Sequence, residues 1–483
     1  MRKFTVYDSL TRSARLFVPL HPPRVGLFVC GLTPYADAHI GHGRTFVTFD
    51  VVARALRRWG YRVFYVQNVT NLDDKVIARA AEEGVDPLAL SERHFAAYHH
   101  AMRQLGVRSV NLYPFATDYI PEILTQIQAL VDRGFAYASQ GSVYYEVAKF
   151  PGYGKLSGQR LEEQRPGTRV EVEPGKRAAG DFALWKASKP GEPTWDSPWG
   201  PGRPGWHIED TAITVRLLGA RYDLHGGGLE LKFPHHEAEI AQAEAATGEA
   251  PLVNYWMHAG LLNMKGEKMA KSLGNVVRLD DALERFGGEV LRFYYLNAVY
   301  RNALEFEQGK SLEEAGEAYE RLLQPYRRIE AALAKAPAGE EGAELPPEIR
   351  AEAAQLVEHL DELLADDFNA REAVAALFGW TRRVGPLGEQ LSELSAAALE
   401  ELAAPYRWAT EVLGLGESIA SERPGTEVGP LVEAALAARR RARARGDYAE
   451  SDRIREDLAS AGIRVEDSEG KTRWEAAPPR PSP

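Results

Sequence analysis

Cysteine is nearly absent from this sequence. Cys30 is the one thiol among 483 residues, so no disulfide can form within the chain. No apolar run approaches the roughly 20 residues that a helix needs to cross a bilayer. The first residues, Met1 to Val6, also lack the apolar core of a secretory signal. We therefore expect a cytoplasmic protein that has no membrane partner.

An excess of positive charge is missing as well. The 58 Lys and Arg residues are outnumbered by 69 Asp and Glu residues, and the net charge is −11. This balance argues against a protein that coats nucleic acid nonspecifically, although it leaves room for a local basic patch. The length predicts two to four domains, because one hydrophobic core rarely organises so long a chain.

Two distant stretches each predict a strand, a helix and a second strand joined by short loops. Apolar runs alternate with segments of helical periodicity in both stretches. The first unit comprises residues 24–30, 42–59 and 62–69, and the second comprises residues 222–225, 235–247 and 253–257. Such units form parallel sheets. We predict an α/β fold in which they are the two halves of one split Rossmann-like catalytic sheet.

The composition changes between and after the two halves. Glycine and proline accumulate after residue 150, and Ala, Leu and Glu dominate from about residue 305 to 410. We therefore expect an inserted connective domain, an α-helical bundle and a small basic C-terminal domain. The expected parts are a first catalytic half at 1–114, the insertion at 115–204, the second catalytic half at 205–255, a loop region at 256–310, the bundle at 311–413 and the C-terminal domain at 425–483.

His39-Ile40-Gly41-His42 lies where the first predicted strand leads into the first predicted helix. A helix N-terminus favours a phosphate through its free N–H groups and its dipole. The two imidazoles can donate to phosphate oxygens, and Gly41 lets the backbone approach. Four residues in a loop can also match by coincidence, so this motif alone indicates little.

Lys268-Met269-Ala270-Lys271-Ser272 follows the last strand of the second half. Two lysines in a glycine-flanked loop can neutralise a departing pyrophosphate. A solvated lysine loop is an equally simple interpretation of this segment alone. The combination is more specific, because one motif follows each half of the sheet in the expected order.

His235 and Glu239 are four residues apart on a predicted helix and therefore share one face. This spacing can bind a metal, but it also describes an ordinary surface pair. Three neighbouring segments decide between these interpretations: Gly205-Trp206-His207-Ile208-Glu209, His225-Gly226-Gly227-Gly228 and Phe233-Pro234-His235-His236-Glu237-Ala238-Glu239-Ile240-Ala241-Gln242.

These segments, together with the histidine and lysine motifs, resemble the cysteinyl-tRNA synthetases, a family of class I aminoacyl-tRNA synthetases. The resemblance covers nearly the whole chain. Ala270 stands where the family usually has serine in its lysine motif. The resemblance implies a ligase that activates cysteine with ATP and magnesium and transfers it to the 3′ end of tRNA(Cys). It also implies a role in tRNA binding for the bundle and in anticodon binding for the C-terminal domain.

The resemblance also implies one zinc ion per chain, which selects the substrate thiol. Three ligands carry over as Cys30, His235 and Glu239. The fourth position holds Asp210, where the family has a second cysteine. An aspartate oxygen is an acceptable but harder zinc ligand. We expect Asp210 to bind zinc and to make the site less selective for sulfur.

The remaining site residues follow from the same resemblance. Catalytic roles are implied for His39, His42, Lys268 and Lys271. ATP contacts are implied for His39, Gly41, His42, Gly226, Gly227 and Lys271. Contacts with the amino acid are implied for Thr70, Trp206 and His225.

The C-terminal domain contains an arginine run at Arg439, Arg440 and Arg441, and Trp474 lies near the end of the domain. Arginine runs are often only solvated helix faces. In a net acidic chain, this run beside a tryptophan favours contact with tRNA. We expect a monomer. Two rivals stay open: a related ligase that joins cysteine to an amino-sugar inositol, and a noncatalytic tRNA-binding paralogue.

Overall fold

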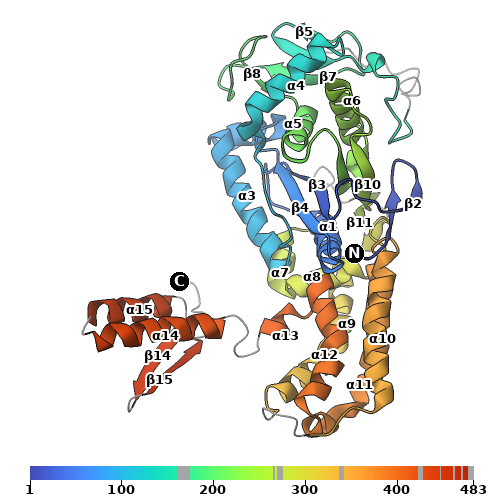
Figure 1. The fold of residues 1–483 in the computed structure, drawn as a ribbon. Helices are drawn as coiled ribbons and strands as arrows, with labels where there is room; N and C mark the ends of the chain where they lie inside the picture. Colours follow the sequence, from blue (N-terminus) through green and yellow to red (C-terminus); the bar gives the residue numbers. More distant parts are fainter. Residues whose placement is uncertain are drawn as a thin grey trace.

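The computed structural model describes residues 1–159, 174–264, 267–268, 276–336, 342–421, 428–445, 448–460, 463–468 and 471–476. Figure 1 shows a central sheet with the insertion above it, the helical bundle below it and the C-terminal module to one side. None of the described helices combines the length and the apolar character needed to cross a membrane.

The central sheet has four parallel strands in the order β10-β9-β3-β4. Their bounds are Arg24–Leu32 for β3, Arg62–Val69 for β4, Tyr222–Gly228 for β9 and Val253–Ala259 for β10. Helix α1, Ile40–Arg58, connects β3 to β4, and helix α6, His235–Thr247, connects β9 to β10. The predicted split parallel sheet is therefore confirmed.

The two halves of the sheet meet where β3 pairs with β9. Leu27 pairs with Leu224, Phe28 with His225 and Val29 with Gly226. Both strands are almost completely buried, as expected for a parallel sheet that is covered on both faces. Because β3 and β9 are parallel neighbours, their carboxyl ends face the same space, although the two strands are nearly 200 residues apart in the sequence.

The insertion is a small α+β unit above this sheet (Figure 1). Its strands form an antiparallel sheet in the order β5-β6-β7-β8, packed against helix α4, Ile120–Asp132. The strand bounds are Ala136–Ser139 for β5, Ser142–Tyr145 for β6, Phe182–Ala187 for β7 and Gly202–Pro204 for β8. Helix α5, Trp206–Leu218, returns the chain to the central sheet.

The other elements flank the sheet or follow it. Near the N-terminus lie β1 at Thr5–Asp8 and β2 at Ser13–Leu16, and after β4 lie α2 at Asp74–Glu83 and α3 at Pro87–Gln104. After β10 come β11 at Leu262–Met264, β12 at Glu267–Lys268, α7 at Leu279–Phe286, α8 at Gly288–Leu296 and β13 at Leu304–Phe306. The bundle contains α9 at Ser311–Leu333, α10 at Pro347–Ala365, α11 at Ala370–Val384 and α12 at Ala396–Trp408, and α13 follows at Glu417–Ser421. The C-terminal module contains α14 at Val428–Ala444, α15 at Tyr448–Ser460, β14 at Ile463–Ser468 and β15 at Lys471–Ala476.

A buried ion pair joins helix α1 to the elements below it. Arg292 on α8 donates from Nη2 to Asp50 on α1 at 2.5 Å, and both side chains are fully buried. Arg292 also donates to the carbonyl oxygens of Leu413 and Leu105. Burial alone would raise the pKa of Asp50, but the guanidinium groups of Arg292 and Arg54 lower it to about 2. The carboxylate is therefore charged at neutral pH and ties α1, the first helix of the central sheet, to α8.

We predict that Asp50→Asn lowers the free energy of unfolding by about 3 kcal/mol, because it leaves a buried guanidinium without its counter-charge. Urea denaturation would measure this loss. Glu320→Gln is the matched control, since it removes the partner of Arg327 in an exposed pair, and we expect it to cost less than about 1 kcal/mol. Equal losses in the two variants would contradict the structural role of Asp50.

Candidate functional site

A cavity of about 550 Å³ opens at the carboxyl ends of the central strands. It brings together residues predicted for different roles: Cys30, His39, Gly41, His42, Thr70 and Trp206 all line it. Of the predicted amino-acid contacts, Thr70 and Trp206 therefore face this space. Parallel α/β sheets commonly bind ligands at this edge.

The histidine motif forms the start of α1 by capping it. His39 accepts a hydrogen bond at Nδ1 from Gly41 N at 3.2 Å, and His42 Nδ1 accepts one from His39 N at 3.0 Å. The two imidazole rings are stacked with their centroids 3.8 Å apart. The motif thus presents two imidazoles and a helix N-terminus to one cavity, which suits a phosphate group.

The segment after the lysine motif lies beside the histidine motif. Ile40 N donates to Val277 O at 3.1 Å, and Leu279 N donates to Ala38 O at 2.9 Å. The backbone of Lys268 belongs to β12, whereas Lys271 and the side chain of Lys268 lie outside the described residues. The chain that follows the lysine motif is therefore hydrogen-bonded next to the N-terminus of α1.

The two glycines predicted to contact ATP, Gly226 and Gly227, are buried in β9. A Cβ atom on Gly226 would lie 2.3 Å from the ring of Phe49, and one on Gly227 would lie 2.8 Å from the ring of His236. Close packing against these rings already requires glycine at both positions.

Three predicted metal ligands converge beside the cavity. One donor atom each of Cys30, Asp210 and His235 lies within 4.8 Å of the others, and all three side chains are buried. His235 Nε2 lies 3.1 Å from Asp210 Oδ2 and 3.1 Å from Glu239 Oε1. Tetrahedral zinc with bonds of about 2.0–2.3 Å places its ligand atoms roughly 3.3–3.8 Å apart. The spacing of these side chains therefore fits a zinc ion after small adjustments.

Glu239 lies at the junction of this cluster and a second one. Its carboxylate groups with His225 and His236, again with donor atoms within 4.8 Å. Among the residues that the structure describes, both Glu239 oxygens are buried without a hydrogen-bond partner. Such atoms are costly unless a cation or another partner completes them. This also favours a bound cation at the cluster.

The charges of the cluster also favour a bound cation. Burial raises the pKa of the Cys30 thiol well above its usual value, and the carboxylates of Asp210 and Glu239 raise it further. Burial and the neighbouring Asp210 likewise raise the pKa of Glu239. Three acidic groups in one dry space repel one another, and a divalent cation would reverse this balance.

Histidines that the sequence analysis did not assign surround this cluster. His207 Nδ1 lies 2.7 Å from His235 Nδ1, and His236 Nδ1 lies 2.9 Å from His258 Nε2. Burial lowers the pKa of His207 and of His236, and it lowers that of His258 to about 3. These imidazoles are therefore neutral at physiological pH. His207 and His236 belong to the segments quoted from the sequence, whereas His258 does not, and only the fold shows that these histidines lie around the cluster.

His225, which is predicted to contact the amino acid, lies beside Glu239. It is fully buried, its ring stacks on Trp256 at 4.3 Å, and its Nδ1 lies 2.7 Å from the Tyr222 hydroxyl. Its Nε2 lies 3.6 Å from Glu239 Oε2. His225 is thus placed to orient the Glu239 carboxylate, and its contact with the amino acid stays a prediction.

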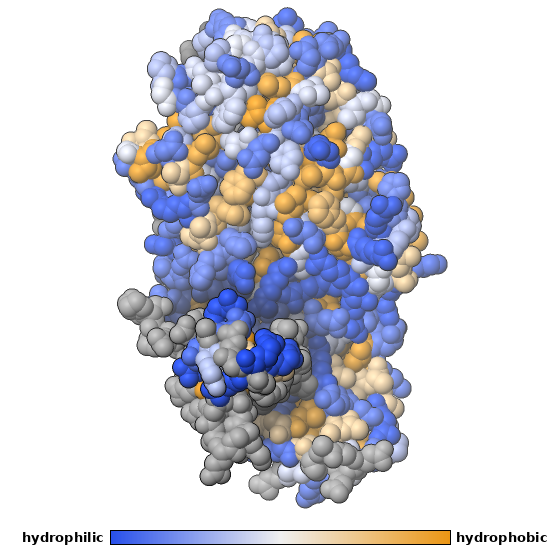
Figure 2. Space-filling model, turned by 60° about the vertical axis from the view of Figure 1, so that its left-hand side comes forward, coloured by the Kyte–Doolittle hydropathy of each residue, from blue (hydrophilic) through white to orange (hydrophobic). Residues whose placement is uncertain are grey.

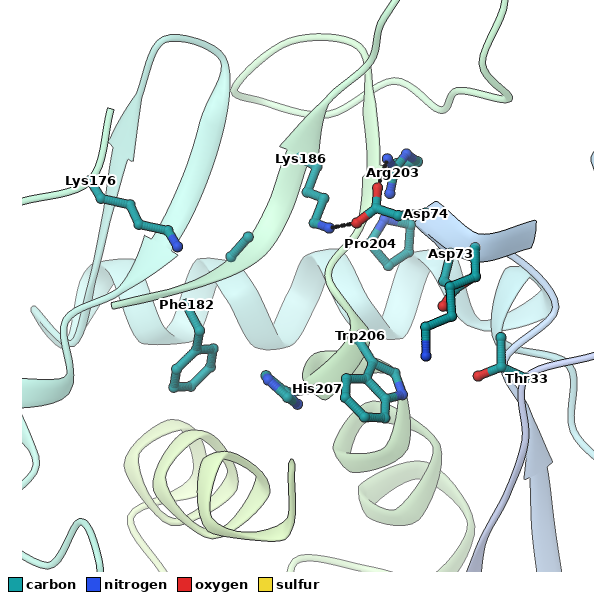
Figure 3. Close-up of a pocket in the computed structure, with 12 residues that line it drawn as sticks. Thr33, Asp73, Asp74, Lys176, Phe182, Lys186, Arg203, Pro204, Trp206 and His207 are labelled. Atoms are coloured by element: carbon teal, nitrogen blue, oxygen red, sulfur yellow. Dashed lines mark hydrogen bonds and ion pairs between the residues drawn. The ribbon is translucent and has the colours of Figure 1, made fainter. Parts of the chain in front are cut away.

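A second pocket of about 320 Å³ adjoins the cavity between the insertion and the catalytic sheet. Trp206, Thr33 and Lys75 line both spaces. Figure 3 shows Lys186 and Arg203 above Trp206, each bonded to Asp74, at 2.5 Å in both cases. Nothing local in the sequence indicates this pocket, because its walls come from segments more than 100 residues apart.

The arginine run lies on α14 of the C-terminal module. The module packs around Val432, Leu436, Leu458 and Ile463. Arg439 is only 1% exposed, whereas Arg441, Arg443 and Arg445 are exposed. Figure 2 shows hydrophilic side chains over the described part of this module. The side chains of Arg440 and Trp474 lie outside the described residues. Solvent-facing contacts are thus available from the later arginines of the run.

Two family models match the chain. Residues 16–316 match the catalytic domain of the class I (C) tRNA synthetases, and residues 426–474 match the cysteinyl-tRNA ligase anticodon binding domain. A cysteine–tRNA ligase of Pseudomonas fluorescens is 44% identical over 98% of this chain and 99% of its own length. One from Methylococcus capsulatus is 46% identical over 97% and 99%, and one from Magnetococcus marinus is 44% identical over 97% of each.

Solved structures with a similar fold are more distant in sequence. Mycobacterium tuberculosis methionyl-tRNA synthetase in complex with methionyl-adenylate superimposes with a TM-score of 0.62 at 17% identity, over 82% of this chain and 92% of the other. LeuRS of Agrobacterium radiobacter, in a ternary complex with tRNA and LeuAMS, gives 0.61 at 12% identity, over 85% and 86%. These similarities concern the fold.

We predict that, after metal removal, Cys30 reacts with iodoacetamide at least about tenfold more slowly than free cysteine at pH 8. Each unit by which the pKa rises lowers the reactive thiolate fraction about tenfold. Asp210→Asn should speed the reaction, because it removes a negative charge that raises the Cys30 pKa.

Mass spectrometry gives an unambiguous readout, since the chain has one cysteine. Asp223→Asn is the control: Asp223 is also buried, but its carboxylate accepts from Leu20 N and Gly26 N instead. The same acceleration in both variants would contradict a specific effect of Asp210 on the thiol.

Proposed function

The chain belongs to the cysteinyl-tRNA synthetase family, and on that basis we propose that it activates cysteine with ATP and transfers it to tRNA(Cys). In the first step, a cysteine carboxylate oxygen forms a bond to the α-phosphorus of ATP while pyrophosphate leaves. In the second step, a ribose hydroxyl at the 3′ end of the tRNA attacks the carbonyl carbon of the adenylate. AMP leaves, and the hydroxyl proton is lost. Magnesium accompanies ATP.

The observation that carries this proposal is the convergence of two predicted sites on one cavity. Cys30 and the histidine motif line the same space of about 550 Å³. An amino acid held by its side chain at the cysteine end could therefore present its carboxylate toward a phosphate at the α1 end. Positioning of this kind can supply a large share of the rate enhancement.

We assign one zinc ion to Cys30, Asp210, His235 and Glu239. Their spacing supports this assignment, as do the two buried oxygens of Glu239, which accept no hydrogen bond from the described residues. When bound, zinc prefers a thiolate to a hydroxyl, which would distinguish cysteine from serine without a second sieve. The adjoining side chains Thr70 and Trp206 would enclose the substrate.

The triphosphate would lie along the other side of the cavity. His39, Gly41 and His42 offer donors at the start of α1, where the helix dipole also favours an anion. We assign charge neutralisation of the leaving pyrophosphate to Lys268 and Lys271. The neighbouring backbone contacts of Val277 and Leu279 with the histidine motif support this arrangement.

The acceptor is proposed to be RNA and not an amino sugar. The match of residues 426–474 to an anticodon-binding domain favours this choice over the amide-forming ligase. The exposed arginines Arg441, Arg443 and Arg445 would contribute contacts to phosphates. A monomeric, cytoplasmic protein remains our expectation.

We predict that Asp210→Ala releases zinc and lowers the selectivity for cysteine over serine, because the ion loses a charged ligand. The loss of affinity should exceed the roughly 10–100-fold typical of removing an outer-shell partner. Asp210→Cys should keep or raise the zinc affinity, since a thiolate is the softer ligand. Metal analysis and ATP–pyrophosphate exchange with each amino acid measure both effects. Full occupancy and unaltered selectivity in Asp210→Ala would show that Asp210 is a bystander.

We also predict that removal of residues 425–483 leaves cysteine-dependent ATP–pyrophosphate exchange within about twofold of the full chain but impairs charging of tRNA. The exposed arginines are remote in sequence from both catalytic motifs. Arg441→Ala alone should reduce the salt dependence of tRNA binding by about one unit of slope. Charging at the full rate by the truncated protein would assign the module another purpose.

A further inference from the structure

Asn68 is a buried amide near the end of β4 that holds one of the assigned metal ligands. Its side chain is 1% exposed. Oδ1 accepts a hydrogen bond from Gly31 N at 2.6 Å, and Nδ2 donates to Asp210 Oδ1 at 2.5 Å. A backbone N–H can only donate and a carboxylate oxygen accepts, so these two partners define which end of the amide is oxygen.

The two oxygens of Asp210 are therefore unequal. Oδ1 is held by Asn68, whereas Oδ2 lies 3.1 Å from His235 Nε2, on the side of the metal cluster. A carboxylate can bind a metal through one oxygen or through both. A thiolate sulfur, which the family has at this position, offers a single donor atom.

This difference matters because the zinc site has little room for another ligand. Cys30, Asp210, His235 and Glu239 would supply four ligands, and the substrate sulfur would be the fifth. Zinc in proteins is usually four-coordinate and sometimes expands to five. A second oxygen from Asp210 would occupy the position that the substrate needs.

We infer that Asn68 is a positioning residue that keeps Asp210 a ligand through Oδ2 alone and so preserves the coordination position for the substrate thiol. This inference rests on the proposed zinc site. It assigns to Asn68 a part in the recognition of cysteine, made necessary by the aspartate at position 210.

Contacts with Gly31 and Thr70 fix the position of Asn68. Gly31 approaches β4 so closely that a Cβ atom there would lie 1.8 Å from the backbone oxygen of Asn68. Gly31 also follows Cys30 directly, so one amide side chain connects the strand of the thiol ligand to the carboxylate ligand. Asn68 Nδ2 also lies 3.5 Å from the hydroxyl oxygen of Thr70, a residue that lines the cavity.

The test is a double-substitution cycle with four proteins: the wild type, Asn68→Ala, Asp210→Cys and the combination. Each is loaded with cobalt(II), whose visible absorption weakens as the coordination number rises and gains a sulfur charge-transfer band when a thiolate binds. Metal content is measured directly. Titration of the charge-transfer band with cysteine gives the dissociation constant without any turnover.

We expect Asn68→Ala to retain the metal, to weaken the cobalt absorption and to weaken cysteine binding by about 10-fold or more. In the Asp210→Cys background, the same substitution should change cysteine binding by less than about twofold, because sulfur has no second donor atom. Loss of the hydrogen bond to Gly31 is common to both backgrounds and therefore cancels in the comparison.

Two further variants separate this role from general structure. Asn68→Asp keeps an acceptor for Gly31 N but removes the donor to Asp210, so it should also weaken cysteine binding. Asn71→Ala is the matched control. Asn71 is also a buried amide, but its Nδ2 donates to Thr117 Oγ1 at 2.7 Å and its Oδ1 accepts from Thr117 N at 3.1 Å. Its loss should therefore leave the cobalt spectrum unchanged.

Unchanged cysteine binding in Asn68→Ala, equal weakening in both backgrounds, or loss of metal from Asn68→Ala would each overturn the inference. These results would leave the zinc assignment standing as long as the wild type binds metal. A wild type that binds neither zinc nor cobalt would instead overturn the zinc site itself, and the inference with it.

Discussion

The pairing of β3 with β9 is the contact on which the rest of this structure depends. It places Phe28 beside His225 and Val29 beside Gly226, across nearly 200 residues of sequence. Cys30 then follows on one strand, while the chain after β9 passes through a short helical turn at Leu229–Lys232 into α6, which carries the proposed ligands His235 and Glu239. If these strands were not neighbours, the thiol, the imidazole and the carboxylates could not share one space. Glycine at position 226 is part of this constraint, because the ring of Phe49 fills the place of its side chain.

The second constraint is electrostatic. Cys30, Asp210 and Glu239 bring three acidic groups into a dry interior, where burial raises the pKa of the thiol and of Glu239. Such a cluster is costly in the absence of a cation, and it is surrounded by neutral imidazoles that do not supply the missing charge. This cost supports the proposed metal ion, whose positive charge would offset the repulsion. An aspartate in place of a second thiolate preserves the charge of that position but introduces a second oxygen, and the amide of Asn68 already holds that oxygen.

The catalytic sheet and the bundle share buried polar contacts. Arg292 on α8 is bonded at once to Asp50 on α1 and to the carbonyl oxygens of Leu105 and Leu413. Helix α1 begins at the histidine motif, so the same helix carries the two imidazoles at one end and the contact with Arg292 further along. The position of the histidine motif is therefore supported from the part of the chain that leads to the anticodon-binding module.

The sequence by itself determined the split parallel sheet, because buried parallel strands and amphipathic crossover helices leave strong periodic signals. It also determined the family, through segments such as the one around His235, and it predicted four metal ligands that the fold brings close together. Only the tertiary structure decided how these side chains divide their roles. His225 lies beside Glu239. Arg439 is buried in the C-terminal module, whereas Arg441 is exposed. Asn68 donates a hydrogen bond to Asp210. Such outcomes depend on side-chain directions and contacts between distant segments, which no local spacing encodes. A periodic pattern reports which face of an element is buried, whereas the partner that the face meets is chosen when the whole chain packs.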